Sequence, residues 1–184
     1  MAKMKILFVS MYNSSRTQMA EGFCKAFYGD KVDVFSAGSD PQEIDQTTID
    51  VMDEVGIDIS KQASNTLMDF LGLEMDYVIM ICGNFHACPV FIGGKNYFKK
   101  PIMDIYPFEG TDEEKIELLR EIRDEIGDWV QDFNYFMNGE ANTLTITDCC
   151  ELVGDDEDGC CDLEGTNGDC CSSTDSAEDK KSNK

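Results

Sequence analysis

Residues 6–22 read ILFVSMYNSSRTQMAEG, and this stretch decides the fold. Lys5 to Val9 is a short run, mostly apolar, of the kind that forms a fully buried strand. From Thr17 to Tyr28 apolar residues recur at helical spacing, and Gly29 follows as a C-terminal cap would. A buried strand that enters a helix directly through the loop Ser10–Thr17 is typical of an α/β protein with a parallel sheet.

The same alternation of strand and helix patterns continues to about residue 138. Thr111 followed by Glu114 is a capping box that starts the longest expected helix. We therefore expect a three-layer α/β domain with a four-stranded parallel sheet and helices on both faces. After the opening strand and helix, strands are expected at 32–36, 76–82 and 101–104, helices at 45–55, 65–71 and 111–136, and a long loop at 83–99.

Three residues with useful chemistry follow or end expected strands: Ser10, Cys82 and Asp104. In an open parallel sheet, ligands bind beyond the carboxyl ends of the strands. We therefore expect these three residues to converge on one site.

The overall charge restricts the partners of the chain. It has 184 residues and a formal net charge of −22, from 37 acidic and 15 basic residues. Such a field repels nucleic acids and anionic membranes, so neither is expected as a partner. Apolar runs are too short for a transmembrane helix or a signal peptide. We expect a monomer in the cytoplasm.

The composition changes near residue 139. Residues 140–184 carry 13 acidic residues and 3 lysines and almost no large apolar residues, so we expect a domain at 1–138 and a disordered tail at 139–184. Adjacent thiols are soft ligands that suit a thiophilic metal ion or arsenite, although the tail could equally be a low-complexity extension without function. The six tail cysteines form three adjacent pairs: Cys149 and Cys150, Cys160 and Cys161, Cys170 and Cys171.

The loop after the first strand has the features of an oxyanion site. Backbone N–H groups at a helix N-terminus lack intrahelical partners, and the helix dipole adds partial positive charge. Arg16 can hold two oxygens of a tetrahedral anion, and Asn13 suits a left-handed turn. An ordinary βα loop with a serine cap is the alternative, whereas a nucleotide-binding loop would contain glycine. The expected oxyanion-binding residues are Met11, Tyr12, Asn13, Ser14, Ser15, Arg16 and Thr17.

Several separated motifs resemble one family. The run Arg16-Thr17-Gln18-Met19-Ala20-Glu21 resembles the loop and helix of thioredoxin-coupled arsenate reductases of the low-molecular-weight phosphatase superfamily, which read Cys-x5-Arg-[Ser/Thr] and then Gln-Met-Ala-Glu. Ser36-Ala37-Gly38, Ile57-Asp58-Ile59-Ser60 and Cys88-Pro89 also match in order. The resemblance covers residues 4 to about 137.

This resemblance implies a chemistry with three thiols. Arg16 would hold arsenate or phosphate, Asp104 would protonate the leaving oxygen, and Cys82 and Cys88 would be the second and third thiols. A thioredoxin-like reductant would then reduce the resulting disulfide. No cofactor is required, and Cys24 is expected to be a core residue.

The resemblance also implies a potassium ion beneath the loop in some relatives. The matching oxygen ligands would come from Asn13, Glu21, Ser36 and Asn65. Asn65 stands where those relatives have an aspartate, and the alternative is a hydrogen-bond network that supports the loop.

The chain departs from the family at the nucleophile. Position 10 is serine instead of cysteine, and Ser15 also stands where many relatives carry a cysteine. A serine hydroxyl is a poor nucleophile without a neighbouring base, and the only histidine, His86, is not expected to serve Ser10. Either both serines are deliberate replacements of the cysteines of an active enzyme, made to stop oxidation or to trap a state, or the chain is a natural non-catalytic homologue. Three hypotheses stay open: an arsenate reductase, a small protein-tyrosine phosphatase, and a non-enzymatic arsenic- or metal-binding protein.

Overall fold

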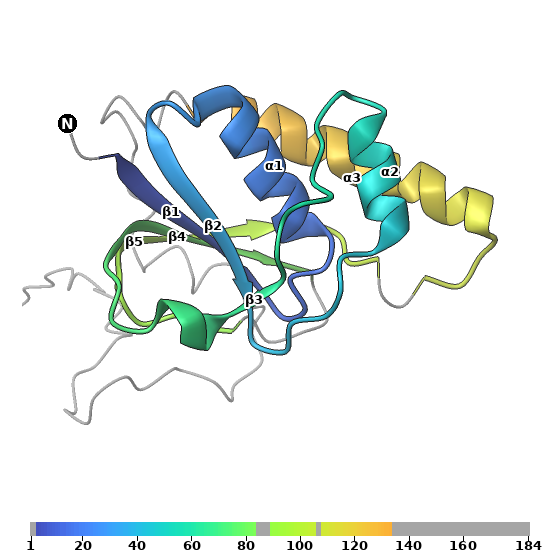
Figure 1. The fold of residues 1–184 in the computed structure, drawn as a ribbon. Coiled ribbons are helices and arrows are strands. Elements are labelled where there is room, and N and C mark those ends of the chain that lie inside the picture. Colours follow the sequence, from blue (N-terminus) through green and yellow to red (C-terminus); the bar gives the residue numbers. More distant parts are fainter. Residues whose placement is uncertain (1–2, 84–88, 106–107, 134–184) are drawn as a thin grey trace, which may run out of the picture. The chain divides into compact units, whose positions relative to one another are not determined.

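The computed structural model describes residues 3–83, 89–105 and 108–133, within the first of two compact units of the chain, residues 1–143 (Figure 1). The second unit, the boundary predicted at residue 138 and all six tail cysteines lie outside the described residues. The described part is an α/β fold around one sheet, in which every strand pair is parallel. Its strands are β1 (Met4–Ser10), β2 (Val32–Gly38), β3 (Asn65–Thr66), β4 (Met75–Cys82) and β5 (Gly94–Pro101). Its helices are α1 (Arg16–Tyr28), α2 (Gln46–Asp53), the 3-10 helix η1 (Leu67–Phe70) and α3 (Asp112–Gln131).

The sheet has five strands in the order β3-β2-β1-β4-β5, so the prediction of four was wrong. The added strand is β3, two residues long, which together with η1 replaces the helix expected at 65–71. The fourth predicted strand, 101–104, was also misplaced, because β5 begins at Gly94 inside the expected loop and ends at Pro101. Exposed residues of this edge strand, among them Lys95, Tyr97 and Lys99, alternate with partly buried ones. The strand therefore has no apolar run that would predict it from the sequence.

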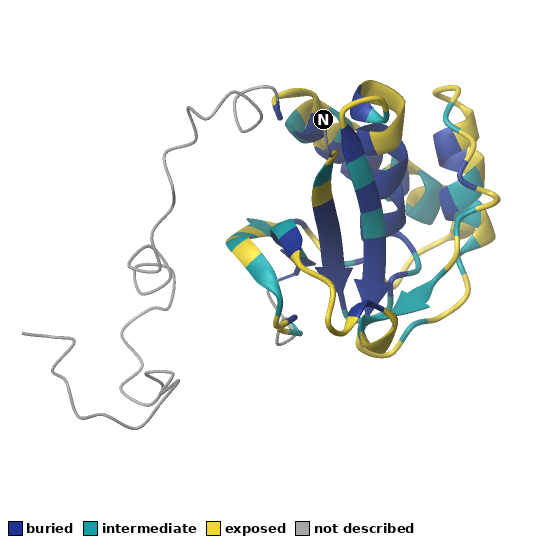
Figure 2. Cartoon of the chain, turned by 60° about the vertical axis from the view of Figure 1, so that its left-hand side comes forward, coloured by how far each residue is buried: buried dark blue, intermediate teal, exposed yellow. Residues whose placement is uncertain are grey.

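The two faces of the sheet are covered unequally. Side chains of α1, α2 and α3 form one large core cluster with alternate residues of β1, β2 and β4, such as Ile6 and Phe8. The other face carries Leu7 and Val9, which pack with Phe70 of η1 and with Phe91. Helices therefore lie on both faces as predicted, but the second face has only the short η1 among the described residues. Figure 2 shows β1 as a buried central strand.

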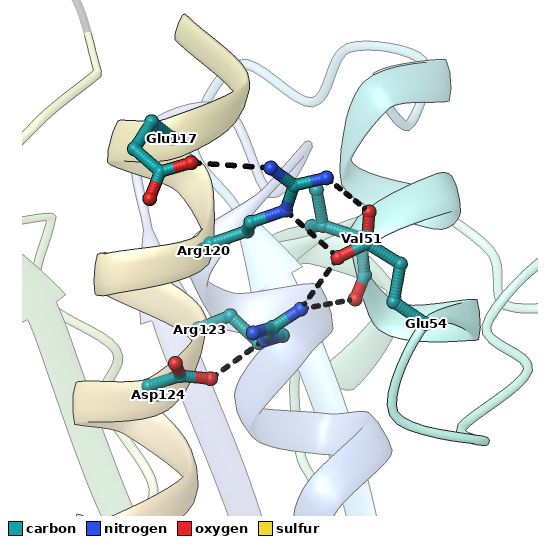
Figure 3. A network of polar contacts seen from close by, with 6 residues as sticks. All are labelled: Val51, Glu54, Glu117, Arg120, Arg123 and Asp124. Atoms are coloured by element: carbon teal, nitrogen blue, oxygen red, sulfur yellow. Dashed lines mark hydrogen bonds and ion pairs between the residues drawn. The ribbon is translucent and has the colours of Figure 1, made fainter. Parts of the chain in front are cut away.

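A network of charged side chains joins α2 to α3 (Figure 3). Arg123 donates to the Val51 carbonyl at 2.9 Å and pairs with Glu54 at 3.0 Å and Asp124 at 2.7 Å. Arg120 pairs with Glu54 at 2.7 Å, and these arginines, Arg120 first, lower the pKa of the Glu54 carboxyl to about 2. The network lies on the helical side of the molecule and fixes α2 against α3.

None of the helices described combines the length and apolar character needed to cross a bilayer.

Candidate oxyanion site

The loop between β1 and α1 folds tightly around Asn13. Asn13 has a φ of +49°, which confirms the predicted left-handed turn residue. Gly38, at the end of β2, permits a close approach of the loop, since a Cβ there would lie 2.6 Å from the Met11 carbonyl oxygen. Asn13, Ser15 and Thr17 are all buried. The loop is therefore buried and packed at the edge of the hydrophobic core.

The carbonyl groups of the loop are satisfied from its outer side. Backbone N–H groups of the segment that follows β2 donate to four loop carbonyls at 2.9 to 3.3 Å: Ser39 to Ser10, Asp40 to Met11, Gln42 to Tyr12 and Asp45 to Ser14. These bonds hold the carbonyl oxygens toward the β2–α2 connection. The N–H groups at the start of α1 have no intrahelical acceptor, because the first bond of that type runs from the Met19 N–H to the Ser15 carbonyl. This arrangement favours an anion at the helix N-terminus.

Ser10 belongs to a chain of neutral hydrogen bonds. Its Oγ accepts from the Asn13 N–H at 3.1 Å and lies 3.1 Å from Thr17 Oγ1. The Thr17 hydroxyl donates its single proton to Asn13 Oδ1 at 2.8 Å, so Ser10 must be the donor to Thr17. Gln18 Nε2 donates to the same Asn13 oxygen at 3.1 Å. The chain ends at a carboxamide, which is not a base, so these contacts do not activate the Ser10 hydroxyl.

Ser15 is held by a residue that sequence reasoning missed. Thr48 of α2 is fully buried, and its hydroxyl donates to Ser15 Oγ at 3.0 Å. The bond positions the start of α1 from the side of α2. The two residues are 33 positions apart, and a threonine inside a helical pattern gives no sign of such a contact.

Arg16 and Asp104 meet at the carboxyl end of the sheet. Arg16 Nη2 lies 2.7 Å from Asp104 Oδ2, and the two side chains are 11% and 7% exposed. Arg16 Nη1 also donates to the Ile102 carbonyl at 2.9 Å. Asp104 therefore lies against the loop after β1, on the side where Ser10, Cys82 and Asp104 were expected to converge, although it lies in the connection after β5 and not on a strand.

Cys82 ends β4 beside the same segment. Its carbonyl accepts from the Ile102 N–H at 3.3 Å, and the residue is disulfide-bonded. Cys88 and His86 lie outside the described residues.

Cys24 is a free thiol in the core, as predicted, and burial followed by the charge of Glu21 raises its pKa to about 12. A thiol in this state is inert at neutral pH, which separates Cys24 from Cys82.

Two buried oxygens bear on the potassium ion that the resemblance implied. Glu21 Oε2 and Ser36 Oγ have no hydrogen-bond partner among the described residues, and the other Glu21 oxygen pairs with Lys25. Such oxygens fit a hard monovalent cation. Asn13 Oδ1 already accepts two hydrogen bonds, and Asn65 Nδ2 donates to the Ser36 carbonyl at 3.2 Å. Glu21 and Ser36 therefore fit a cation better than Asn13 does.

Together, the parallel sheet, the loop of helix-start amides, the arginine and the facing carboxylate define a protein of the phosphatase-like oxyanion-binding class. The family model for low molecular weight phosphotyrosine protein phosphatase matches residues 5–137. The chain therefore belongs to the low molecular weight phosphotyrosine protein phosphatase family.

Several relatives of this chain are named arsenate reductases. The arsenate reductase of Halalkalibacterium halodurans is 40% identical over 134 residues, 72% of this chain and 96% of that protein. The glutaredoxin arsenate reductase of Synechocystis is 35% identical over 127 residues, 69% of this chain and 93% of that protein. A solved arsenate reductase in the phosphate binding state superposes with a TM-score of 0.59 at 32% identity, covering 71% of this chain and 95% of the other.

Proposed function

We propose that this chain is an arsenate reductase by descent and architecture, and that its loop binds arsenate or phosphate. The proposal depends on one group of contacts. Arg16 of the loop pairs with Asp104 and donates to the Ile102 carbonyl. The Ile102 N–H donates to the carbonyl of Cys82 at the end of β4. The residues proposed as the anion-holding group, the acid and the redox cysteine are thus within one small region. The identity to named arsenate reductases supports the same reading.

In the proposed reaction, loop amides and Arg16 hold the oxygens of arsenate while a thiolate at position 10 attacks arsenic. A sulfur–arsenic bond forms, an arsenic–oxygen bond breaks, and Asp104 supplies the proton to the departing oxygen. The Cys82 thiolate then attacks the sulfur at position 10. The sulfur–arsenic bond breaks with its electron pair left on arsenic, which is reduced from As(V) to As(III). Cys88 next attacks Cys82, forms the Cys82–Cys88 disulfide and releases the thiol at position 10.

The serine at position 10 stops this sequence before its first covalent step. Its proton is directed to Thr17 and then to a carboxamide, so nothing in this chain of contacts raises the nucleophilicity of its oxygen. We propose that the native chain binds the oxyanion reversibly. This chemistry is the same for deliberately introduced serines and for the serines of a natural non-catalytic homologue.

The remaining partners are proposed on the same basis. A thioredoxin-like or glutaredoxin-like dithiol would reduce the Cys82–Cys88 disulfide, and a reducing cytoplasm suits such thiols. A potassium ion bound by Glu21 Oε2 and Ser36 Oγ would supply a partner to these two buried oxygens. The six tail cysteines would bind arsenite or a thiophilic metal ion, and titration of the full chain against a variant with all six changed to serine would measure their contribution.

The test of function is steady-state arsenite production by Ser10→Cys with arsenate, thioredoxin, its reductase and NADPH. We expect turnover that is absent from the native chain. Turnover should be lost again when Cys82→Ser or Cys88→Ser is added, whereas Cys24→Ala, a matched change of a core cysteine, should retain it. Hydrolysis of an aryl phosphate without arsenate reduction would instead assign a phosphatase. No turnover of either substrate would overturn the enzymatic proposal.

A further inference from the structure

Gly83 directly follows Cys82, the last residue of β4, and lies against Asp104. It is buried, and a Cβ at this position would lie 2.9 Å from Asp104 Cβ and 3.2 Å from the Asp104 backbone nitrogen. The first of these distances is shorter than real Cβ atoms allow. The same Cβ would be 3.5 Å from Arg16 Nη1, an ordinary contact. A methyl group here would therefore displace Asp104 and only touch Arg16.

The neighbours of Gly83 decide which side must move. Cys82 pairs in register with Pro101, and its carbonyl accepts from the Ile102 N–H at 3.3 Å, so the end of β4 is fixed by the sheet. Asp104 lies two residues further along, beyond the last paired residue of β5. The atoms that an added Cβ would meet first both belong to Asp104, so with the end of β4 held by the sheet the displacement would fall on Asp104.

We propose that Gly83 is a positioning residue for the general acid Asp104. The absent side chain lets Asp104 pack directly on the strand that ends in the redox cysteine. The proposal rests on the proposed function, because an acid needs a leaving group to protonate. It predicts a selective loss: proton donation suffers, whereas oxyanion binding by the loop and Arg16 remains.

The experiment uses the full chain with Ser10→Cys and two aryl phosphates. p-Nitrophenyl phosphate has a good leaving group that needs little protonation, and phenyl phosphate has a poor one that depends on the acid. Asp104→Asn should lower kcat for phenyl phosphate about 100-fold. Gly83→Ala should lower the same kcat at least about 10-fold, since a misplacement of about 1 Å has costs of this size. Both variants should change kcat for p-nitrophenyl phosphate far less.

Two further measurements separate positioning from general damage. In the double variant Gly83→Ala and Asp104→Asn, kcat for phenyl phosphate should equal that of Asp104→Asn alone, because the first change acts through the second residue. In the native Ser10 background, Gly83→Ala should keep the Kd for phosphate within about threefold, as expected for a contact that leaves Arg16 in place. Gly127→Ala is the matched control: its Cβ meets the Phe23 ring at 3.0 Å, far along α3, and should alter neither kcat nor Kd.

Each outcome has a defined reading. An unchanged kcat in Gly83→Ala, equal losses with both substrates, or additive losses in the double variant would overturn the positioning role alone. Loss of phosphate binding in Gly83→Ala, by unfolding or by a displaced loop, would also overturn it. An inactive Ser10→Cys chain would remove the proposed function, and the positioning role with it.

Discussion

Two nearly buried arginines in this chain have almost the same local contacts. Arg16 donates to the Ile102 carbonyl at 2.9 Å and pairs with Asp104 at 2.7 Å. Arg123 donates to the Val51 carbonyl at 2.9 Å and pairs with Asp124 at 2.7 Å (Figure 3). An arginine with a carbonyl and a carboxylate partner is therefore not in itself a binding site.

The surroundings separate the two arginines. Arg16 is the first residue of α1, at the carboxyl end of β1, where unpaired N–H groups of the helix start gather. Arg123 lies in the middle of α3, where main-chain groups are already bonded, and its Glu54 partner is 40% exposed. In the proposed function the arginine side chain serves anion binding in the first place, whereas in the second it joins two helices.

The largest expected effect is on anion binding by Arg16. Arg16→Ala should weaken phosphate binding to the native chain at least about 100-fold, because two charge-assisted hydrogen bonds to the anion are lost. Arg16→Lys keeps the charge without the two-pronged geometry and should give an intermediate Kd. Calorimetric titration measures both. Arg123→Ala is the matched control and should bind phosphate as the native chain does; equal losses in the two alanine variants would erase the distinction drawn above.

A smaller effect is expected on the free energy of unfolding, and it concerns Arg123. Arg123→Ala removes three hydrogen bonds and leaves the buried Val51 carbonyl without its donor. A loss of about 2 kcal/mol is expected for a charged donor of this kind. This corresponds to a melting temperature lower by roughly 5 °C. Thermal unfolding followed by circular dichroism would show it, and an unchanged melting temperature would mean that the network in Figure 3 contributes nothing to the packing of α2 on α3.

The smallest effect concerns pH. The pKa of Glu54 is lowered from 4.5 to about 2, chiefly by Arg120 and then by Arg123, so its charged form is favoured in the folded state. The resulting stabilisation is complete above the ordinary pKa of 4.5 and is lost as the pH falls toward 2. Glu54→Gln should therefore be less stable than the native chain at pH 6, and the two should converge near pH 2. Urea unfolding at several pH values tests this; a stability difference that stays constant with pH would contradict it.

The comparison also shows how far the sequence could lead. The run from Lys5 to Tyr28 predicted β1, the loop and α1, because a buried strand, a polar loop and a helical period are all local patterns. The rule that ligands bind at the carboxyl ends of parallel strands predicted that Asp104 would lie near the loop after β1, and Asp104 pairs with Arg16 of that loop.

Other features depend on contacts that no local pattern encodes. The edge strand β5 was expected as loop because its exposed lysines conceal the strand, and β3 is too short to have a period. Thr48 and Gly83 contribute through neighbours far away in sequence, one through a hydroxyl and the other through the lack of a side chain. Tertiary packing alone reveals such residues.

The central claim is that the site lacks only a sulfur atom in place of Ser10 Oγ to reduce arsenate. A single-turnover experiment without external reductant tests it, with arsenite and intact mass measured after arsenate is mixed with fully reduced protein. Ser10→Cys should form about one arsenite per chain, counted as free and protein-bound arsenite together, and lose two hydrogens as Cys82 and Cys88 form their disulfide, as expected for one two-electron exchange. The native chain should release none and keep its mass. Arsenite from the native chain, or none from Ser10→Cys, would contradict the account.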